Sequence, residues 1–249
     1  MRQTVNTRPR HHVKAALVAV ACLAALFAVT QPATSPAGVT ASAKVASAKY
    51  PKAGVILWKK LAAHSSPRES SPTVKVFPQF RADFRPTALL VFGMRKDAKG
   101  VRWLKLSIPM RPNGRTGWVK AAAVQMRPVR RAIVINLSSR KLRVLERGKT
   151  RFGTRVAIGR AGIETPTGNF YLMATFKPKE RFLGAFAFET SAYSKLSEWP
   201  GGGVVGLHGT SMPWLLGQAV SHGCVRMSNA AALVLKRLTP AGTPLKIVA

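Results

Sequence analysis

The chain has 249 residues, and its 40 Lys and Arg residues against 8 Asp and Glu residues give a formal net charge of +32. The excess is not one basic tail, since residues 44–129 hold 18 basic and 3 acidic residues and residues 130–249 hold 18 and 5. Such a charge is typical of nucleic-acid-binding proteins, but the chain has no helix-turn-helix, zinc-finger or RNP-type pattern. We therefore expect no nucleic acid as a partner and favour an anionic extracellular polymer, such as a bacterial envelope.

The first 43 residues have the layout of an export signal. A basic start without acids precedes the unbroken apolar run Ala15–Val29, and Ala-Ser-Ala follows at 41–43, which is the order of parts in a signal peptide. The apolar run is shorter than the ~20 residues that a spanning helix needs, so cleavage is favoured over anchoring. We expect an exported protein that meets the membrane only through this segment, if it stays uncleaved.

Removal of that signal, which contains Cys22, would leave Cys224 as the one cysteine of the mature chain. An exported protein that uses disulfides carries its cysteines in pairs, so this fold is not cross-linked. A lone thiol in an oxidising compartment is either buried and inert or kept for its reactivity. The residues around Cys224 favour the second interpretation.

Residues 44–72 are rich in Ser, Ala, Pro and Lys and are predicted to be a linker with a short ordered piece. From Thr73 onward, short apolar runs alternate with Gly, Pro and Asn-Gly turns, which is typical of a small β-barrel or sandwich. The stretch WLKLSIPMRPNGRTGWVKAAAV resembles the closing strands of bacterial SH3-like domains. The resemblance implies an SH3-like domain over residues 73–128, either a wall-binding module or a plain structural spacer.

Residues 129–249 are predicted to form a second β-rich domain. The runs AIVINL, KLRVLE, FGTRVAIG and FYLMATF are separated by short turns and indicate consecutive hairpins. One helix is expected, AAALVLKRL, with Ser228 or Asn229 as its N-cap, and PLKIV is a last strand. The predicted fold class is therefore mainly β: a small SH3-like β-barrel followed by a β-rich domain with a short helix after Cys224.

A cysteine nucleophile needs a base, because the thiolate is the reactive form. His208 lies 16 residues upstream of Cys224, and His222 lies two residues before it, which on an extended backbone would place both side chains on one side. Gly223 between them would leave the approach to the backbone open. Spacing alone leaves both histidines as candidates.

The base must also be oriented by a third group. From residue 199 to the C-terminus the chain has no Asp or Glu, so we expect a backbone carbonyl next to His208, that of Gly209, to orient it. Arg226, two residues after the cysteine, is a candidate for binding a substrate carboxylate. The alternative for Arg226 is a solvated surface position in a very basic chain.

The motif Ser-His-Gly-Cys-Val-Arg-Met at 221–227, with His-Gly-Thr sixteen residues before the cysteine, resembles the signature of the L,D-transpeptidase catalytic domain. Thr165 to Gly168, Thr-Pro-Thr-Gly, and the Gly-rich segment before His208 match the same family. The resemblance covers about residues 130–249. It implies Cys224 as nucleophile, His208 as general acid/base and Arg226 as a contact for the substrate. It also implies a group of residues that support the site or its oxyanion, namely His222, Gly223, Gly209 and Ser221.

The resemblance further implies an enzyme of peptidoglycan biosynthesis, and hence of cell-wall organisation and cell shape. Its partners would be peptidoglycan stem peptides and anionic wall polymers, and no cofactor or metal is expected. Cys224 would release D-alanine from a tetrapeptide donor and form a thioester, which an amine of a neighbouring stem resolves into a cross-link. Resolution by water would make the protein an L,D-carboxypeptidase instead.

Two other functions compete with this one. A zinc hydrolase could use His208, His222 and Cys224 as ligands, but His-x-Cys is poor spacing and no acid is near to act as base. A non-catalytic wall-binding protein would account for the charge and for the SH3-like stretch. Loss of activity with a thiol alkylator but not with a chelator would exclude the zinc enzyme.

Overall fold

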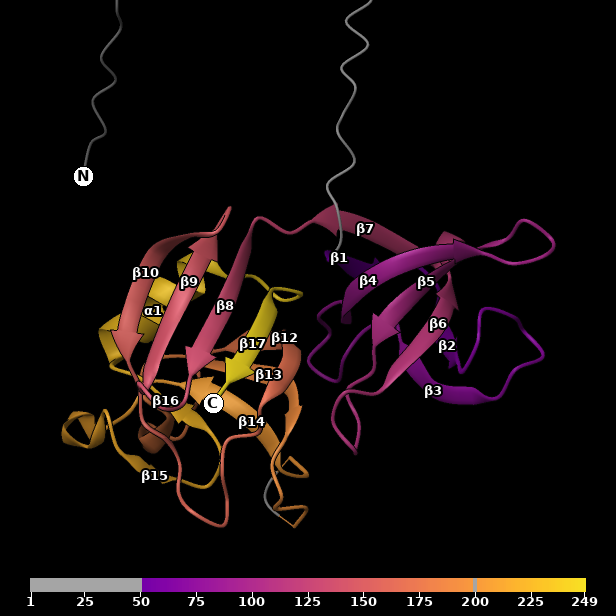
Figure 1. The fold of residues 1–249 in the computed structure, drawn as a ribbon. Coiled ribbons are helices and arrows are strands. Elements are labelled where there is room, and N and C mark those ends of the chain that lie inside the picture. Colours follow the sequence, from indigo (N-terminus) through magenta and orange to yellow (C-terminus); the bar gives the residue numbers. More distant parts are fainter. Residues whose placement is uncertain (1–50, 199–200) are drawn as a thin grey trace, which may run out of the picture. The chain divides into compact units, whose positions relative to one another are not determined.

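The structure is a computed structural model, and it describes residues 51–198 and 201–249. The expected signal over residues 1–43, with Cys22, lies outside the described residues. The described residues all fall within one compact unit and are mainly β-strands with a single α-helix (Figure 1). None of the helices in this described part is long and apolar enough to span a membrane.

The first half of the described chain forms one seven-stranded sheet. Its strands are β1 (Lys52–Ile56), β2 (Lys60–His64), β3 (Thr73–Pro78), β4 (Ala88–Lys96), β5 (Arg102–Ser107), β6 (Thr116–Lys120) and β7 (Val124–Pro128). Within the sheet they lie in the order β3-β2-β6-β5-β4-β1-β7. Along the chain, the 3-10 turn η1 (Ala121–Ala123) connects β6 to β7. Alternate side chains, among them Leu104, Leu106 and Val119, are fully buried in one core. The likeness of this sheet to SH3-like domains stays a prediction.

Part of the predicted linker is not a linker, because residues 52–64 hold two strands of this sheet. β1 is an interior strand that pairs with both β4 and β7, and β2 pairs with both β3 and β6. The strands were missed because their residues are mostly Lys, Ala and Gly, which are depleted in strands. Small size is what this position needs, since a Cβ atom on Gly54 would lie 2.6 Å from a methyl group of Val124.

The second half of the described chain forms an eight-stranded sheet in the order β10-β9-β8-β17-β12-β13-β14-β16. Its strands are β8 (Arg131–Asn136), β9 (Lys141–Glu146), β10 (Lys149–Arg155), β12 (Gly168–Phe176), β13 (Ala187–Tyr193), β14 (Val204–His208), β16 (Val225–Arg226) and β17 (Pro244–Val248). A separate parallel pair joins β11 (Ile158–Gly159) to β15 (Ala219–Ser221). β17 pairs in parallel with β8, and β14 pairs in parallel with β16. The predicted hairpins β8–β9 and β9–β10 are present.

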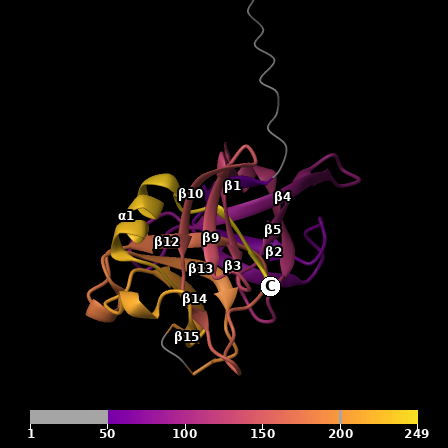
Figure 2. The same ribbon diagram turned by 60° about the vertical axis from the view of Figure 1, so that its left-hand side comes forward.

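The helix α1 (Asn229–Leu238), the yellow coil at the left of Figure 2, follows β16 in the chain. A helix after Cys224 is what the sequence predicts. Ser228 is its N-cap, because the Ser228 hydroxyl accepts the backbone N–H of Ala231 at 3.2 Å. Ala231, Ala232 and Leu235 are buried in the same core as the sheet of residues 131–248. This packing fixes the segment that leads out of the Cys224 turn.

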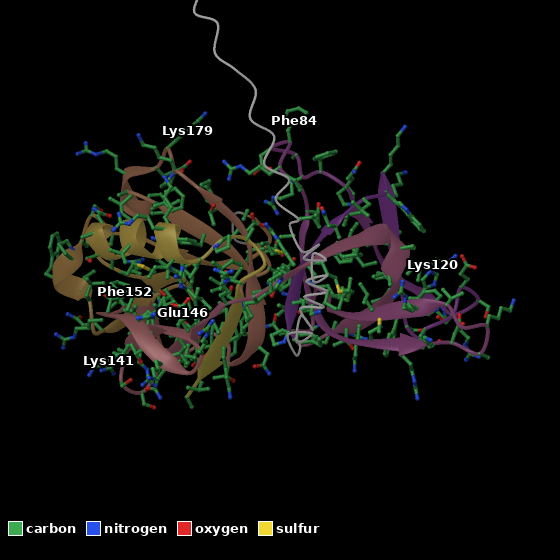
Figure 3. The ribbon with its side chains drawn as sticks, turned by 90° about the horizontal axis from the view of Figure 1, so that it is seen from above. Phe84, Lys120, Lys141, Glu146, Phe152 and Lys179 are labelled. Atoms are coloured by element: carbon green, nitrogen blue, oxygen red, sulfur yellow. The ribbon has the colours of Figure 1, made fainter. Side chains whose placement is uncertain are left out.

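The basic side chains lie mostly on the outside of the protein. Lys141 and Lys179, for example, point away from the ribbon in Figure 3 and are exposed. Exposed charges on a surface make only small contributions to stability. The high net charge therefore lies on the protein surface, where it can attract anionic partners. It does not alter the packing of the two apolar cores.

Candidate active site

Cys224 lies on a tight turn between β15 and β16 and is partly buried. Gly223, just before it, has a φ of +109°, and a Cβ atom there would lie 2.9 Å from Cβ of Ser194. Only glycine fits this position without strain. The Ser221 hydroxyl closes the turn, because it donates to the carbonyl of Cys224 and accepts the N–H of Gly223 at 3.1 Å. Ser221 and Gly223 therefore shape the turn.

The parallel pairing of β14 with β16 brings His208 to the cysteine. Leu207 is opposite Val225 and His208 is opposite Arg226, so Cys224 lies opposite Gly206. The Gly206 N–H donates to Sγ of Cys224 at 3.3 Å. A Cβ atom on Gly206 would lie 3.7 Å from that sulfur and 3.9 Å from Cδ2 of His208. Thiol and imidazole thus share the space that the missing Gly206 side chain leaves open.

His208 is held in one tautomer. Its side chain is 4% exposed, and Nδ1 lies 2.6 Å from the carbonyl oxygen of Gly209. A carbonyl oxygen only accepts hydrogen bonds, so Nδ1 carries the proton and Nε2 keeps its lone pair. Cδ2, the ring atom bonded to Nε2, is the one near the space shared with the thiol. The orienting contact predicted for the Gly209 carbonyl is therefore present.

Burial favours the uncharged form of both groups. It lowers the pKa of His208 to about 4; the Gly209 carbonyl opposes this shift and the Arg226 charge adds to it. Burial also raises the pKa of the Cys224 thiol, although the Gly206 N–H and the Arg226 charge act to lower it. At neutral pH the pair is therefore a thiol beside a neutral imidazole. The proton can pass to Nε2 as the sulfur attacks.

Thr165, from the Thr-Pro-Thr-Gly motif, connects the turn to the body of the domain. Its buried hydroxyl donates to the carbonyl of Gly223 at 2.9 Å and accepts the N–H of Gly159 at 2.9 Å. The hydroxyl thus acts both as donor and as acceptor, and the motif positions the catalytic turn. The sequence indicated that the motif belongs to the same family as the Cys224 motif, but it did not predict the role of the Thr165 hydroxyl.

Arg226 lies at the edge of the site with a half-buried side chain. Its backbone exchanges two hydrogen bonds of 2.9 Å with Ala157, which fixes the start of its side chain. Among residues 51–198 and 201–249, no acidic side chain forms an ion pair with Arg226. A guanidinium with no carboxylate partner next to a nucleophile is suited to a substrate carboxylate.

His222 is half-buried on the turn before Cys224. The expectation that it shares a side with Cys224 assumed an extended backbone, whereas the positive φ of Gly223 makes residues 221–224 a turn. A supporting role for His222 stays a prediction. The imidazole that shares the space beside Gly206 with the thiol is that of His208, from β14.

Asn229 and Gly206 are site residues that the sequence did not single out for these roles. The Asn229 side-chain oxygen accepts the backbone N–H groups of Ala185 at 2.9 Å and Thr210 at 3.2 Å, which fixes the chain just after His208. A Cβ atom on Gly209 would lie 2.3 Å from that oxygen. For Gly206 a signal existed, since strand alternation places a residue two before His208 on the same face.

The donor atoms present do not suggest a metal centre. In the described ranges, no three His, Cys, Asp or Glu side chains lie close enough together to hold an ion. The alternative of a zinc hydrolase is therefore left without a ligand set in this part of the chain. A thiol beside an oriented neutral imidazole, on a β scaffold, instead defines the class of cysteine-nucleophile sites that carry out acyl transfer.

Comparison with known proteins agrees with this class. Residues 130–247 match the family model described as the L,D-transpeptidase catalytic domain. The chain is 31% identical over 115 residues to YkuD of Bacillus licheniformis, and 33% identical over 92 residues to YkuD of Bacillus subtilis, both named as L,D-transpeptidases. The matches cover 46% and 37% of this chain, and 64% and 50% of the relatives' own length. Residues 130–247 are thus similar to the L,D-transpeptidase catalytic-domain family.

Solved structures with some likeness include an L,D-transpeptidase from Mycobacterium smegmatis, at 14% identity and a TM-score of 0.42. That match covers 59% of this chain and 90% of the other. Bd1075 of Bdellovibrio bacteriovorus is 28% identical with a TM-score of 0.38, and the match covers 48% of each chain.

Proposed function

We propose that this chain is an exported peptidoglycan L,D-transpeptidase that acts in cell-wall biogenesis through a thioester on Cys224. The observation that carries the proposal is the β14–β16 pairing, which puts the thiol and the His208 imidazole into one shared space. The family of residues 130–247 supplies the substrate class. The high positive charge supports an anionic envelope as the place of action.

In the first step, Cys224 attacks the carbonyl at the L-centre of diaminopimelate in a tetrapeptide stem. The thiol proton moves to Nε2 of His208 while the S–C bond forms. Collapse of the intermediate breaks the C–N bond to D-alanine, and the same proton passes to the leaving amine. Because His208 starts neutral, it can serve as base and then as acid within one step.

The developing oxyanion needs a backbone donor near the sulfur. The N–H of Gly223 is already taken by the Ser221 hydroxyl and the N–H of Gly206 points to the sulfur itself. This leaves the backbone N–H of Cys224 as the candidate on the turn. Arg226 would hold a carboxylate of the donor stem, which fits its lack of an acidic partner among the described residues.

In the second step, an amine of a neighbouring stem attacks the thioester. The new C–N bond replaces the C–S bond, the amine proton passes to Nε2 of His208, and from there it returns to the sulfur. If water took the place of the amine, the product would be the tetrapeptide shortened by D-alanine. That outcome would be the carboxypeptidase activity.

The test is intact-protein mass spectrometry after incubation of the full chain with a tetrapeptide stem. We expect a mass increase equal to the acyl part of the stem on Cys224, with one D-alanine released per adduct. The Cys224→Ala variant should give neither, and the Ser228→Ala variant, changed only at the helix cap, should give both. Binding of stem without an adduct in the wild-type chain would favour the non-catalytic wall-binding protein instead.

A further inference from the structure

The loop between β5 and β6, which belongs to the seven-stranded sheet, makes a well-defined contact with the segment after β13. The Asn113 side chain exchanges two hydrogen bonds with the backbone of Tyr193, at 2.8 and 2.9 Å. Arg111 donates to the carbonyls of Ser194 and Gly202, each at 2.8 Å, and its guanidinium lies 4.9 Å from the Tyr193 ring centre. The side-chain amide therefore pairs with Tyr193 as a neighbouring strand would.

The same segment touches the catalytic turn. Cβ of Ser194 is the atom that a side chain on Gly223 would meet at 2.9 Å, and the Glu164 carbonyl lies 3.8 Å from that point. Thr165, next to Glu164, holds the Gly223 carbonyl. The turn before Cys224 thus rests on residues 164–165 and 194, and residue 194 is in turn held by Arg111.

These residues line an open cavity of about 660 Å³. Its lining combines the loop residues Arg111 and Asn113 with Glu164, Thr165, Tyr193 and Lys195 from the second half of the chain. This volume is within the usual range for small-ligand sites, about 300–1,000 Å³. Two further contacts connect the cavity to the catalytic turn, since Ser194 and the Glu164 carbonyl lie within 4 Å of a Cβ atom placed on Gly223.

The cavity offers one negative and one positive group side by side. Glu164 and Lys195 form an ion pair of 2.9 Å, with side chains 52% and 71% exposed. An exposed ion pair of this kind contributes little to stability. A ligand that carries an amine and a carboxylate can therefore displace it and form two ion pairs, one with Glu164 and one with Lys195. The Lys195 hydrogen bond is the main cause of the low pKa of Glu164, about 2, and the carboxylate is therefore charged at any working pH.

We propose that this cavity is the subsite for the acceptor stem, and that the β5–β6 loop of the seven-stranded sheet completes it through Arg111 and Asn113. The ligand is a peptide that presents a free amine next to a carboxylate, as the side chain of diaminopimelate does. The inference rests on the proposed function and deepens it. A two-substrate enzyme needs a place for each stem, and the donor carboxylate is assigned to Arg226, which does not line this cavity.

In this subsite Glu164 and Lys195 bind and orient the acceptor, and His208 keeps the role of base. The ammonium bound at Glu164 first releases one proton to solvent and then attacks as a neutral amine. A carboxylate with so low a pKa is a weak base, so the proton that the amine loses on attack goes to Nε2 of His208 and then to the departing sulfur. Arg111 and Asn113 act as positioning residues through Tyr193 and Ser194. Their removal should therefore alter the acceptor step more than the donor step.

The experiment separates the two steps in the full chain. Acylation of Cys224 by a tetrapeptide donor is followed by mass spectrometry, and cross-link formation is followed against the concentration of a diaminopimelate-containing acceptor peptide. For Lys195→Ala and Glu164→Gln, whose side chains do not hold the catalytic turn, we expect acylation rates within about twofold of wild type. For Arg111→Ala and Asn113→Ala we expect acylation to change less than the response to acceptor does. We expect the half-saturating acceptor concentration to rise about tenfold.

Two matched controls remove the same charges elsewhere. Arg115→Ala changes an exposed arginine of the same β5–β6 loop, and Lys179→Ala changes an exposed lysine of the other sheet; both should match wild type. If Arg111→Ala or Asn113→Ala lowers the unfolding temperature, the variants at the two exposed positions, Glu164 and Lys195, decide whether the cavity binds the acceptor. An unchanged acceptor dependence in those variants overturns the subsite.

Acceptor binding to the Cys224→Ala chain, measured by calorimetry, tests the subsite even without turnover. Binding about tenfold weaker when Lys195→Ala is added supports the proposal, and equal binding overturns it. Absence of any acyl adduct on the wild-type chain would count against the proposed function. The two failures are thus distinguishable.

Discussion

The two sheets are built from similar short strands, but their strands pair differently. In the sheet of residues 52–128 every pair is antiparallel, whereas residues 131–248 include the parallel pair β14–β16. Parallel neighbours need a crossover connection in place of a tight hairpin. That crossover brings His208 beside a cysteine 16 residues later. The comparison indicates that the reactive pair depends on the parallel pairing, which the first sheet lacks.

Each sheet contains a histidine whose Nδ1 is hydrogen-bonded to a backbone carbonyl. Replacing each histidine in turn by glutamine should give the largest difference in acylation rate between the two sheets. His64 in β2 lies 2.9 Å from the Ser71 carbonyl, and His208 lies 2.6 Å from that of Gly209. For His208→Gln we expect the rate of Cys224 acylation to fall about 10²–10⁴-fold, because the base is lost. For His64→Gln we expect no change. Equal effects in a rapid-quench measurement with the tetrapeptide donor would contradict the assignment of the base.

The second difference is a dependence of stability on pH that comes from His208. Its pKa in the folded chain, about 4, is below the ordinary value of 6.5, so the unfolded chain binds more protons between these pH values. Stability therefore falls as the pH drops from 6.5 to 4, by roughly 3 kcal/mol. Urea unfolding at several pH values measures this loss, and His208→Gln should remove most of it. A pH dependence that is the same in both proteins would show that another group is responsible.

Two glycines with a positive φ allow a further comparison between the catalytic turn and a turn of the first sheet. Gly223 beside Cys224 and Gly100 in the first sheet have φ values of +109° and +78°, but only Gly223 has a neighbour within 4 Å of an added Cβ. Gly100→Ala should lower the free energy of unfolding by about 1 kcal/mol through backbone strain and leave acylation unchanged.

Gly223→Ala carries the same strain and also pushes against Ser194, so the turn must shift. We expect its acylation rate to fall about 10–100-fold, because displacement of a nucleophile by a fraction of an ångström is costly. Unfolding and acylation measured on both variants provide the check. Full activity in Gly223→Ala would mean that the turn geometry is not required.

The smallest effect concerns the helix that follows the site. Ser228→Ala removes the N-cap of α1, and we expect about 1 kcal/mol lower stability, with an acylation rate close to wild type. Thermal unfolding and the mass-spectrometric assay measure the two quantities. A large loss of activity would show that the helix cap controls the position of Cys224 more directly than its hydrogen bonds indicate.

Local patterns in the sequence predicted much of this arrangement. Strands β8, β9, β12 and β17 and helix α1 followed from short apolar runs and from Ser228, and Cys224 and His208 were singled out by their motif. Strands β13 and β14 were not predicted. β1 was not predicted because it contains small residues, which are uncommon in strands. These residues allow close packing against Val124 and Val91. The role of Gly206 and the contact of Arg111 and Asn113 with the Tyr193 segment depend on pairing between distant parts of the chain. No local pattern contains that information.

The Cys224 thiol and the His208 imidazole rest as a neutral pair in this description of the site. The decisive test is the rate at which iodoacetamide alkylates Cys224, measured against pH by mass spectrometry of the Cys224 peptide so that Cys22 does not contribute. We expect the rate to rise with a midpoint above the ordinary thiol value of ~8.5, because burial raises this pKa. A rate that is already constant below pH ~6 would show a thiolate–imidazolium pair and would contradict the account.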